Sequence, residues 1–199
     1  VVINSVPMRD VIVGSGIRGL AVAPSTMDLA GAEIELVGMV NREGQLRRAL
    51  EGERGGYEYV LVDCPPSLGL LTLNALTAAD SVMVPIQCEY YALEGLGQLM
   101  KTIALIQQRL NPGLKLEGVV LTMFDGRTNL SIQVAEEVKR YFRTKVYRTL
   151  IPRSVRLSEA PSHGKPITLY DARCRGAEVY KELAKEVMSR AEEGTGEGA

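Results

Sequence analysis

The fold is decided by the stretch Tyr57-Glu58-Tyr59-Val60-Leu61-Val62-Asp63-Cys64-Pro65-Pro66-Ser67. Residues 59–62 are apolar without a break, which predicts a strand buried on both faces, as in the middle of a parallel sheet. The two prolines end that strand. Asp63 is therefore expected at its carboxyl end, where open α/β sheets hold their ligands. An apolar strand that ends in aspartate is typical of the acidic Mg²⁺-site element of phosphate-handling folds, and the alternative is an aspartate that only starts a loop.

The composition is that of an ordinary globular protein. The 199 residues are 46% hydrophobic and 24% charged, which fits one domain or slightly more. No apolar run approaches the roughly 18 residues of a membrane helix, and residues 1–5 do not resemble a signal peptide. The three cysteines lack metal-ligand spacing and fit a reducing compartment. We therefore expect a cytoplasmic protein that does not span a membrane.

Charge is distributed unevenly along the chain. Residues 1–114 carry 8 basic and 12 acidic side chains, whereas residues 115–190 carry 15 basic and 9 acidic ones. Residues 191–199 add three glutamates and no base. A basic C-terminal half is compatible with a polyanionic partner, although solvated helix faces would produce part of the same excess.

Strand and helix patterns alternate along the chain. Strands are predicted at 59–62, 81–85, 116–123 and 145–151, and helices at 28–37, 41–52, 68–79, 93–110, 129–141 and 176–190. This order predicts an α/β fold with a doubly wound, mostly parallel sheet and helices on both faces. The loops that follow the strands, at 63–67, 85–91, 123–129 and 151–165, are expected to gather at one rim. We expect one domain over residues 1–190 and a disordered acidic tail over 191–199.

A glycine-rich segment near the start matches the pattern G-x-G-x-x-G over Gly14–Gly19. A dinucleotide-binding loop of this kind must open a helix, but the residues that follow, 20–24, predict a strand that ends in a proline. We interpret the segment as a glycine-rich turn before a strand.

Several of these loops together resemble the ParA/Soj family of chromosome- and plasmid-partition ATPases. The resemblance covers about residues 20–190, and the stretches that carry it are Val62–Gly69, Thr72–Leu76, Val84–Gly95, Leu121–Leu130 and Ile151–Pro166. Any one of these stretches is weak by itself, but the five in this order are specific.

The resemblance implies a P-loop NTPase-like fold and an ATP-dependent switch. Such proteins bind Mg-ATP, dimerise around it, bind double-stranded DNA without sequence preference, and release it when a ParB-type centromere-binding partner stimulates hydrolysis. Asp63 would then hold Mg²⁺ through a water, and Pro152, Arg153 and Val155 would lie beside the nucleotide. Two arginines, Arg127 and Arg156, match those the family uses on DNA, which implies a nucleoid-associated location.

The basic residues agree with this DNA-binding interpretation. Residues 127–156 contain eight lysines and arginines and only two acids. Few aromatic side chains are interleaved, so phosphate contacts with duplex DNA fit better than base reading. For each arginine taken alone, a surface salt bridge is the alternative.

The phosphate-binding part of the site is absent from the 199 residues. No G-x-x-x-x-G-K-[ST] motif occurs, because Gly164-Lys165 is followed by Pro166. Phosphoryl transfer depends mostly on positioning and charge neutralisation by such a loop. We therefore expect no ATP hydrolysis by this chain alone, no complete catalytic set, and an origin as the C-terminal four-fifths of a longer ATPase whose N-terminal strand and P-loop are missing.

Two other functions stay open. The chain could be a non-catalytic ParA-like remnant or adaptor that keeps only DNA or partner binding. It could also be a MinD-type membrane switch, but the acidic, glycine-rich residues 191–199 are unlike the basic amphipathic helix that ends that type. Among other residues, Glu89, Tyr90 and Tyr91 follow a strand and could serve the site, the dimer or packing.

Overall fold

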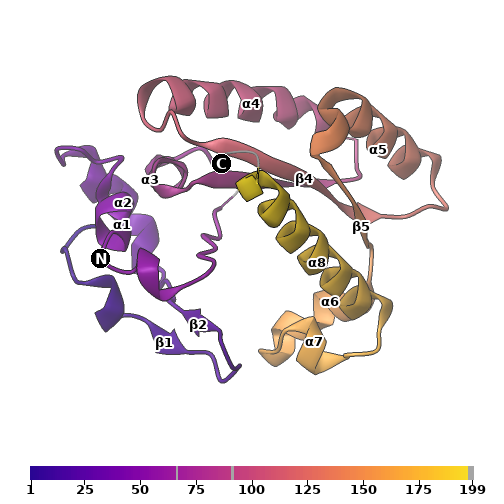
Figure 1. Ribbon diagram of the computed structural model, residues 1–199, viewed down its shortest axis with the longest axis horizontal. Coiled ribbons are helices and arrows are strands. Elements are labelled where there is room, and N and C mark those ends of the chain that lie inside the picture. The colour runs from indigo at the N-terminus through magenta and orange to yellow at the C-terminus, as the bar shows by residue number, and fades with distance from the viewer. Residues whose placement is uncertain (66, 91, 197–199) are drawn as a thin grey trace. The chain divides into compact units, whose positions relative to one another are not determined.

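The computed structural model describes residues 1–65, 67–90 and 92–196. The chain forms two compact units, which Figure 1 shows as ribbons. Unit 1 consists of Val1–Val82 and Lys101–Lys115, and unit 2 of Met83–Met100 and Leu116–Ala199. The prediction of a single domain over residues 1–190 stays a prediction, and each unit is described separately below.

Unit 1 begins with a short antiparallel hairpin. Strands β1 (Val13–Gly14) and β2 (Ala21–Val22) pair with Val13 opposite Val22. In the turn between them Gly16 and Gly19 have φ values of 78° and 79°, which glycine tolerates and other residues rarely adopt. The interpretation of Gly14–Gly19 as a turn before a strand is therefore confirmed.

A buried asparagine joins two of the helices of unit 1. The helices of this unit include α1 (Asp28–Val37), α2 (Gln45–Leu50) and α3 (Leu70–Ala78), beside short 3-10 turns at Met8–Asp10 and Arg54–Gly56. The Asn74 side chain is buried in α3, accepts a hydrogen bond from the Leu46 amide at 3.1 Å and donates to the Arg42 and Leu70 carbonyls at 2.7 and 2.9 Å. Because every polar atom of this amide is used, it orients α2 on α3 without an unsatisfied group.

A second asparagine supports the end of α3. The α4 helix (Ala92–Arg109) ends just before Asn111, whose Nδ2 atom donates to the Leu76 carbonyl at 3.0 Å and to the Ala79 carbonyl at 2.7 Å. The last carbonyls of a helix have no partner within it. Asn111 supplies partners to two carbonyls at the end of α3, and this accounts for a buried polar residue there.

The predicted strand at residues 59–62 is wrong in the structure. Residues 57–65 form neither helix nor strand, and the apolar side chains are exposed, from 42% for Val62 to 91% for Leu61. Pro66 lies outside the described residues. An apolar run expresses a preference for burial, but a strand forms only when neighbouring strands satisfy its backbone groups. No strand in the described part of the chain pairs with this segment.

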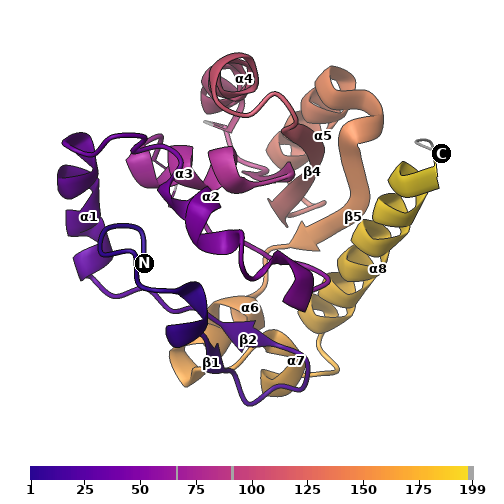
Figure 2. The same ribbon diagram turned by 60° about the vertical axis from the view of Figure 1, so that its left-hand side comes forward.

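Unit 2 is built around a three-stranded sheet in the order β3-β4-β5. The strands are β3 (Ser81–Gln87), β4 (Lys115–Phe124) and β5 (Val146–Pro152), and β4 and β5 are parallel. The connection between β4 and β5 contains α5 (Asn129–Phe142) and a 3-10 turn at Arg143–Lys145. Figures 1 and 2 show α5 and α8 (Arg175–Gly196) on opposite faces of this sheet. The expected α/β arrangement with parallel pairing and helices on both faces is confirmed here.

One hydrophobic cluster of unit 2 lies between the strands β4 and β5 and the helix α8. Val120, Tyr147, Ile151 and Val179 are buried together, and Leu157, Leu183 and Val187 pack against them. The α8 residues of this cluster, Val179, Leu183 and Val187, recur every four residues and therefore lie on one helical face. Gly118 makes room for the Tyr147 ring, since a Cβ atom at Gly118 would lie 2.5 Å from its Cε2 atom.

An irregularity in β5 is matched by a carboxylate from α8. Pairing advances by two residues on β4, from Val119 to Leu121, while β5 advances by four, from Val146 to Leu150. The extra residues form a bulge. Glu186 accepts hydrogen bonds there from the amides of Arg148 and Thr149 at 2.8 and 3.0 Å.

Short helices replace part of the long loop predicted at 151–165. They are α6 (Val155–Glu159), a 3-10 turn at Ala160–His163, and α7 (Ile167–Tyr170). The prolines and glycines in this stretch suggested a loop, but they stand at helix ends, with Gly164 at φ 61° after the 3-10 turn. The α8 helix continues to Gly196, and the disordered tail over 191–199 stays a prediction.

Candidate functional site

Three of the four predicted loops meet in unit 2. The Cys88 amide after β3 donates to the Thr122 carbonyl of β4 at 2.9 Å, and the Ser131 hydroxyl of α5 donates to the Cys88 carbonyl at 3.2 Å. The Arg153 amide after β5 donates to the Phe124 carbonyl at 3.1 Å. The loops after β3, β4 and β5 therefore lie side by side at the carboxyl ends of the strands, as expected. The fourth loop, at 63–67, belongs to unit 1, and its place at this rim stays a prediction.

In the loop after β4 the Arg127 side chain is exposed to solvent and is paired with the carboxylate of Asp125. Asp125 Oδ1 accepts from Arg127 Nε at 2.9 Å, and Oδ2 accepts from Nη2 at 2.7 Å. The Arg127 side chain is 89% exposed and that of Asp125 only 19%. Hydrogen bonds from Arg127, with a contribution from the charge of Arg153, lower the pKa of Asp125 to about 2. Asp125 is thus ionised at every physiological pH.

The backbone before this loop is strained. Met123 has a φ of 54°, which is unusual for a residue other than glycine. It lies where β4 gains one residue relative to β5, between the pairs Leu121–Leu150 and Phe124–Pro152. Bulges and left-handed residues recur where a strand end aims a functional loop, and this one directly precedes Asp125 and Arg127.

The loop after β5 carries the predicted nucleotide residues. Pro152 is half-buried, Arg153 is exposed, and Val155 at the start of α6 is 73% exposed. The Arg153 guanidinium forms an ion pair with Glu89 in the loop after β3, with Nη2 and Oε1 2.5 Å apart. Pro152 and Val155 offer apolar surface on either side of an arginine that a carboxylate already holds.

Arg156 lies in an acidic surrounding. Its guanidinium pairs with Glu159 at 3.1 Å and with Asp171 at 3.6 Å. The Tyr170 hydroxyl donates to Glu159 at 3.1 Å, and the Tyr170 ring stacks on His163. Arg156 is exposed, as a phosphate contact requires, but it is also anchored.

Asp63 is exposed at the end of the irregular segment 57–65 in unit 1. Among the side chains that the structure describes, no salt bridge joins it. No group of three or more possible metal ligands occurs within the described residues. A single accessible carboxylate fits a metal held through water, as proposed for Mg²⁺, but it does not make a metal site alone.

The basic residues of the C-terminal half are all accessible. Every one of the eight lysines and arginines between residues 127 and 156 is exposed. Within the described residues, four of them form ion pairs, and these are Arg127, Arg140, Arg153 and Arg156.

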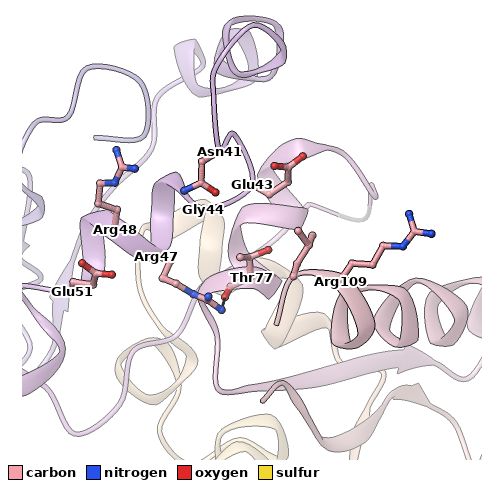
Figure 3. A pocket seen from close by; sticks show the side chains of 9 residues that line it. Asn41, Glu43, Gly44, Arg47, Arg48, Glu51, Thr77 and Arg109 are labelled. Atoms are coloured by element: carbon pink, nitrogen blue, oxygen red, sulfur yellow. Dashed lines mark hydrogen bonds between the residues drawn. The ribbon is translucent and has the colours of Figure 1, made fainter. Parts of the chain in front are cut away.

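Unit 1 contains a separate polar hollow of about 420 Å³, shown in Figure 3. Arg47 extends toward Thr77 and donates to its carbonyl, whereas the Arg48 and Arg109 guanidinium groups extend away in different directions. The donors do not converge on a common point, so the hollow is not assigned a ligand.

Two of the residues that organise the rim were not predicted as functional. Asp125 lies in the stretch Leu121–Leu130 that carries the family resemblance, but the sequence assigns it no function. For Glu89 the sequence leaves three roles open: in the site, in the dimer or in packing. A carboxylate two residues before an arginine in a strand-end loop was the available signal for Asp125. Tyr90 is 73% exposed, and Tyr91 lies outside the described residues.

Comparison with known protein families identifies an AAA domain over residues 1–116. The chain is 63% identical to the sporulation initiation inhibitor protein Soj of Bacillus subtilis over 95% of its own length and 75% of that protein. It is 56% identical to the chromosome partitioning protein ParA of Myxococcus xanthus over 94% of its own length and 66% of that protein.

Among solved structures, the chain resembles the cobyrinic acid a,c-diamide synthase of Mycobacterium smegmatis with bound ADP and magnesium. The TM-score is 0.82 with 37% identity, over 98% of this chain and 71% of that one. A second structure of the same enzyme, with the same TM-score, holds an ATP analogue and magnesium. These likenesses confirm the P-loop NTPase-like fold, and the bound nucleotides agree with the expected Mg-ATP. No helix in the described part of the chain is long and apolar enough to cross a bilayer.

Proposed function

Because the chain belongs to the ParA/Soj family of chromosome-partitioning ATPases, we propose that it is the part of an ATP-dependent DNA-binding switch that holds DNA. In this proposal Mg-ATP drives formation of a homodimer, and the dimer binds double-stranded DNA without sequence preference. A ParB-type protein then releases it. A cytoplasmic, nucleoid-associated location follows from the DNA binding.

The observation that carries the proposal is the meeting of the three strand-end loops in unit 2. Arg127 and Arg156, the predicted DNA contacts, are both exposed on or directly after these loops. Six further exposed bases occur between residues 127 and 156. Within residues 127–156 Tyr141 is exposed, whereas Phe142 and Tyr147 are buried, so most of the exposed surface of these bases is polar. Exposed guanidinium groups suit phosphate oxygens, and phosphate contacts are the basis of binding without sequence preference.

The nucleotide residues and the DNA residues share one backbone contact. The Arg153 amide, in the predicted nucleotide loop, donates to the Phe124 carbonyl, one residue before Asp125 in the predicted DNA loop. The two loops are therefore hydrogen-bonded to each other through their backbones. This contact supports a switch in which the nucleotide state alters the DNA-binding surface.

Each unit taken by itself contains residues whose chemistry suits a part of Mg-ATP. Asp63 offers an accessible carboxylate for a metal-bound water, and Pro152 and Val155 offer apolar surface for a purine. Mg-ATP, when bound, supplies the phosphoanhydride that is hydrolysed. Residues 1–199 contain no G-x-x-x-x-G-K-[ST] loop for its phosphates.

A second candidate is a non-catalytic ParA-like adaptor that keeps DNA or partner binding. Equilibrium binding of a fluorescent ATP analogue with Mg²⁺ separates the two. A switch binds the analogue and binds DNA more tightly in its presence, whereas an adaptor binds DNA equally with or without it. The mass of the intact protein from its own cell tests the expectation that a phosphate-binding loop lies outside residues 1–199.

A salt titration of DNA binding tests the assignment of the DNA surface. We expect Arg127→Ala and Arg156→Ala each to weaken binding to a duplex of random sequence. Each should also reduce the slope of log K against log salt by about 0.9, the value for one lost phosphate contact. Arg9→Ala is the matched control, because Arg9 is also exposed and also paired with a neighbouring carboxylate, but lies in unit 1. Unchanged slopes in both test variants would disprove the DNA surface.

A further inference from the structure

Asp125 holds Arg127 in a way that leaves most of the guanidinium free. Arginine carries five N–H donors in a rigid plane. Asp125 takes one from Nε and one from Nη2, at 2.9 and 2.7 Å. The other three donors, both on Nη1 and the second on Nη2, make no hydrogen bond in the described part of the chain. The guanidinium is thus fixed along one edge and open along the other.

The carboxylate itself is firmly placed. Its side chain is 19% exposed, and Oδ1 also accepts from the Arg127 amide at 3.0 Å. The Asp125 carbonyl accepts from the amide and the hydroxyl of Thr128, at 3.1 and 3.0 Å. The Asp125 amide donates to the Ser131 hydroxyl at 3.4 Å, and Ser131 is buried in α5. The end of β4 and the start of α5 therefore together determine the orientation of the Arg127 guanidinium.

From this geometry we propose that Asp125 is a positioning residue, which orients the free edge of Arg127 toward a DNA phosphate. The inference rests on the proposed DNA binding and adds a residue that acts through Arg127. A long arginine side chain loses much rotamer freedom when it binds a ligand. A carboxylate that restricts the side chain beforehand reduces that loss at the moment of binding.

The proposal makes a prediction whose sign differs from that of simple electrostatics. A carboxylate near a polyanion repels it, so removing Asp125 by charge alone should strengthen DNA binding. If Asp125 instead orients Arg127, its removal releases the guanidinium and weakens binding. The low pKa of Asp125, about 2, keeps the carboxylate charged across the whole usable pH range, so the two effects are compared in one charge state.

The test compares Asp125→Ala with Glu136→Ala in the protein as its gene encodes it, with Mg-ATP and a duplex of random sequence. Glu136 is an exposed carboxylate of α5, so its removal changes the net charge by the same amount. We expect Asp125→Ala to reduce the slope of log K against log salt by about 0.9. The affinity at 50 mM salt divided by the affinity at 200 mM salt should then be roughly 3.5-fold smaller than in the wild type. Glu136→Ala is expected to leave the slope unchanged and to strengthen binding slightly.

A double-mutant cycle separates positioning from a general structural effect. If Asp125 acts through Arg127, Asp125→Ala has no further effect on DNA binding in an Arg127→Ala background. Asp125→Asn keeps one acceptor oxygen and the shape of the side chain, so it should fall between wild type and Asp125→Ala and guards against a folding defect. If Asp125→Ala binds DNA as tightly as Glu136→Ala, the positioning role is wrong although the DNA surface stands. If the wild-type protein shows no salt-dependent binding, the proposed function itself fails.

Discussion

Glu186 offers the sharpest test of how unit 2 is held together. Its Oε1 atom accepts from the Arg148 amide and from Arg190, and its Oε2 atom accepts from the Thr149 amide and hydroxyl, all within 3.0 Å. Glu186→Gln keeps one acceptor oxygen and turns the other into a donor that faces donors. One β5 amide then loses its partner, at a cost of about 1–3 kcal/mol, and the remaining hydrogen bonds lose their charge.

We therefore expect Glu186→Gln to lower the free energy of unfolding by about 2–3 kcal/mol. For a chain of this length that corresponds to roughly 4–12 °C in the melting temperature. Glu182→Gln is the matched control, since Glu182 is on the same helix but is exposed, and its salt bridge within the described residues is with Arg175. Amide hydrogen exchange at Arg148 and Thr149 should speed up in the test variant alone. The explanation is refuted if the free energies of unfolding of the two variants differ by less than about 0.5 kcal/mol.

The same prediction has a pH dependence with a definite sign. Burial by itself raises the pKa of Glu186, but hydrogen bonds from Arg148 and Thr149 and the charge of Arg190 outweigh it and lower the pKa below 4.5. A lowered carboxylate pKa contributes stability above the unfolded value, and this is lost as the pH falls through the folded pKa. The difference between wild type and Glu186→Gln should therefore shrink below about pH 4.5, where protonated Glu186 resembles glutamine.

Two further predictions concern packing and thiol reactivity. Gly118→Ala should destabilise unit 2 by about 1–3 kcal/mol, because the new methyl group would lie 2.5 Å from the Tyr147 ring. Gly97→Ala, where a Cβ meets no atom within 4 Å on helix α4, should stabilise by about 0.5–1 kcal/mol in the same urea titrations. In the native protein at pH 8 a thiol reagent should label exposed Cys64 but not Cys88, which is 2% exposed and whose pKa burial raises to about 11. Equal labelling rates for the two thiols would contradict the packing after β3.

The sequence predicted most elements correctly because local signals and burial agree there. Asn129–Phe142 begins after Thr128, whose side chain accepts from the Ser131 amide as a helix cap, and its apolar residues recur at helical spacing. The strand predicted at residues 59–62 is wrong because there the local signal and the burial disagree. Their apolar character is real, but strand formation depends on partners elsewhere in a sheet, which no local pattern contains.

The candidate site was predictable in its loops but not in its internal contacts. Strand-end loops of a parallel sheet must share an edge, so the meeting of 85–91, 123–129 and 151–165 followed from topology. The ion pairs of Arg127 with Asp125 and of Arg153 with Glu89 depend on side-chain geometry. Arg153 and Glu89 are also 64 residues apart, and sequence order gives no indication of such a pair.

These ion pairs change how the basic half of the chain should be interpreted. The arginines that the family resemblance singles out, Arg127, Arg153 and Arg156, are each held by a carboxylate. Within the described residues, four other exposed bases form no salt bridge, and these are Lys139, Arg143, Lys145 and Arg148. Unpaired, flexible bases attract a polyanion from any direction, whereas a guanidinium fixed along one edge accepts a phosphate in one orientation.

The two groups would therefore contribute to DNA binding in different ways. The unpaired lysines and arginines raise the rate of association, since their charges are not neutralised by a neighbour. The paired arginines contribute geometry, because each is connected through its carboxylate to a loop or helix of unit 2. A DNA surface that responds to the nucleotide needs the second kind of contact, since only a contact tied to the backbone moves when the loops move. Asp125, to which the sequence assigned no role, and Glu89, whose role it left open, provide this connection for Arg127 and Arg153.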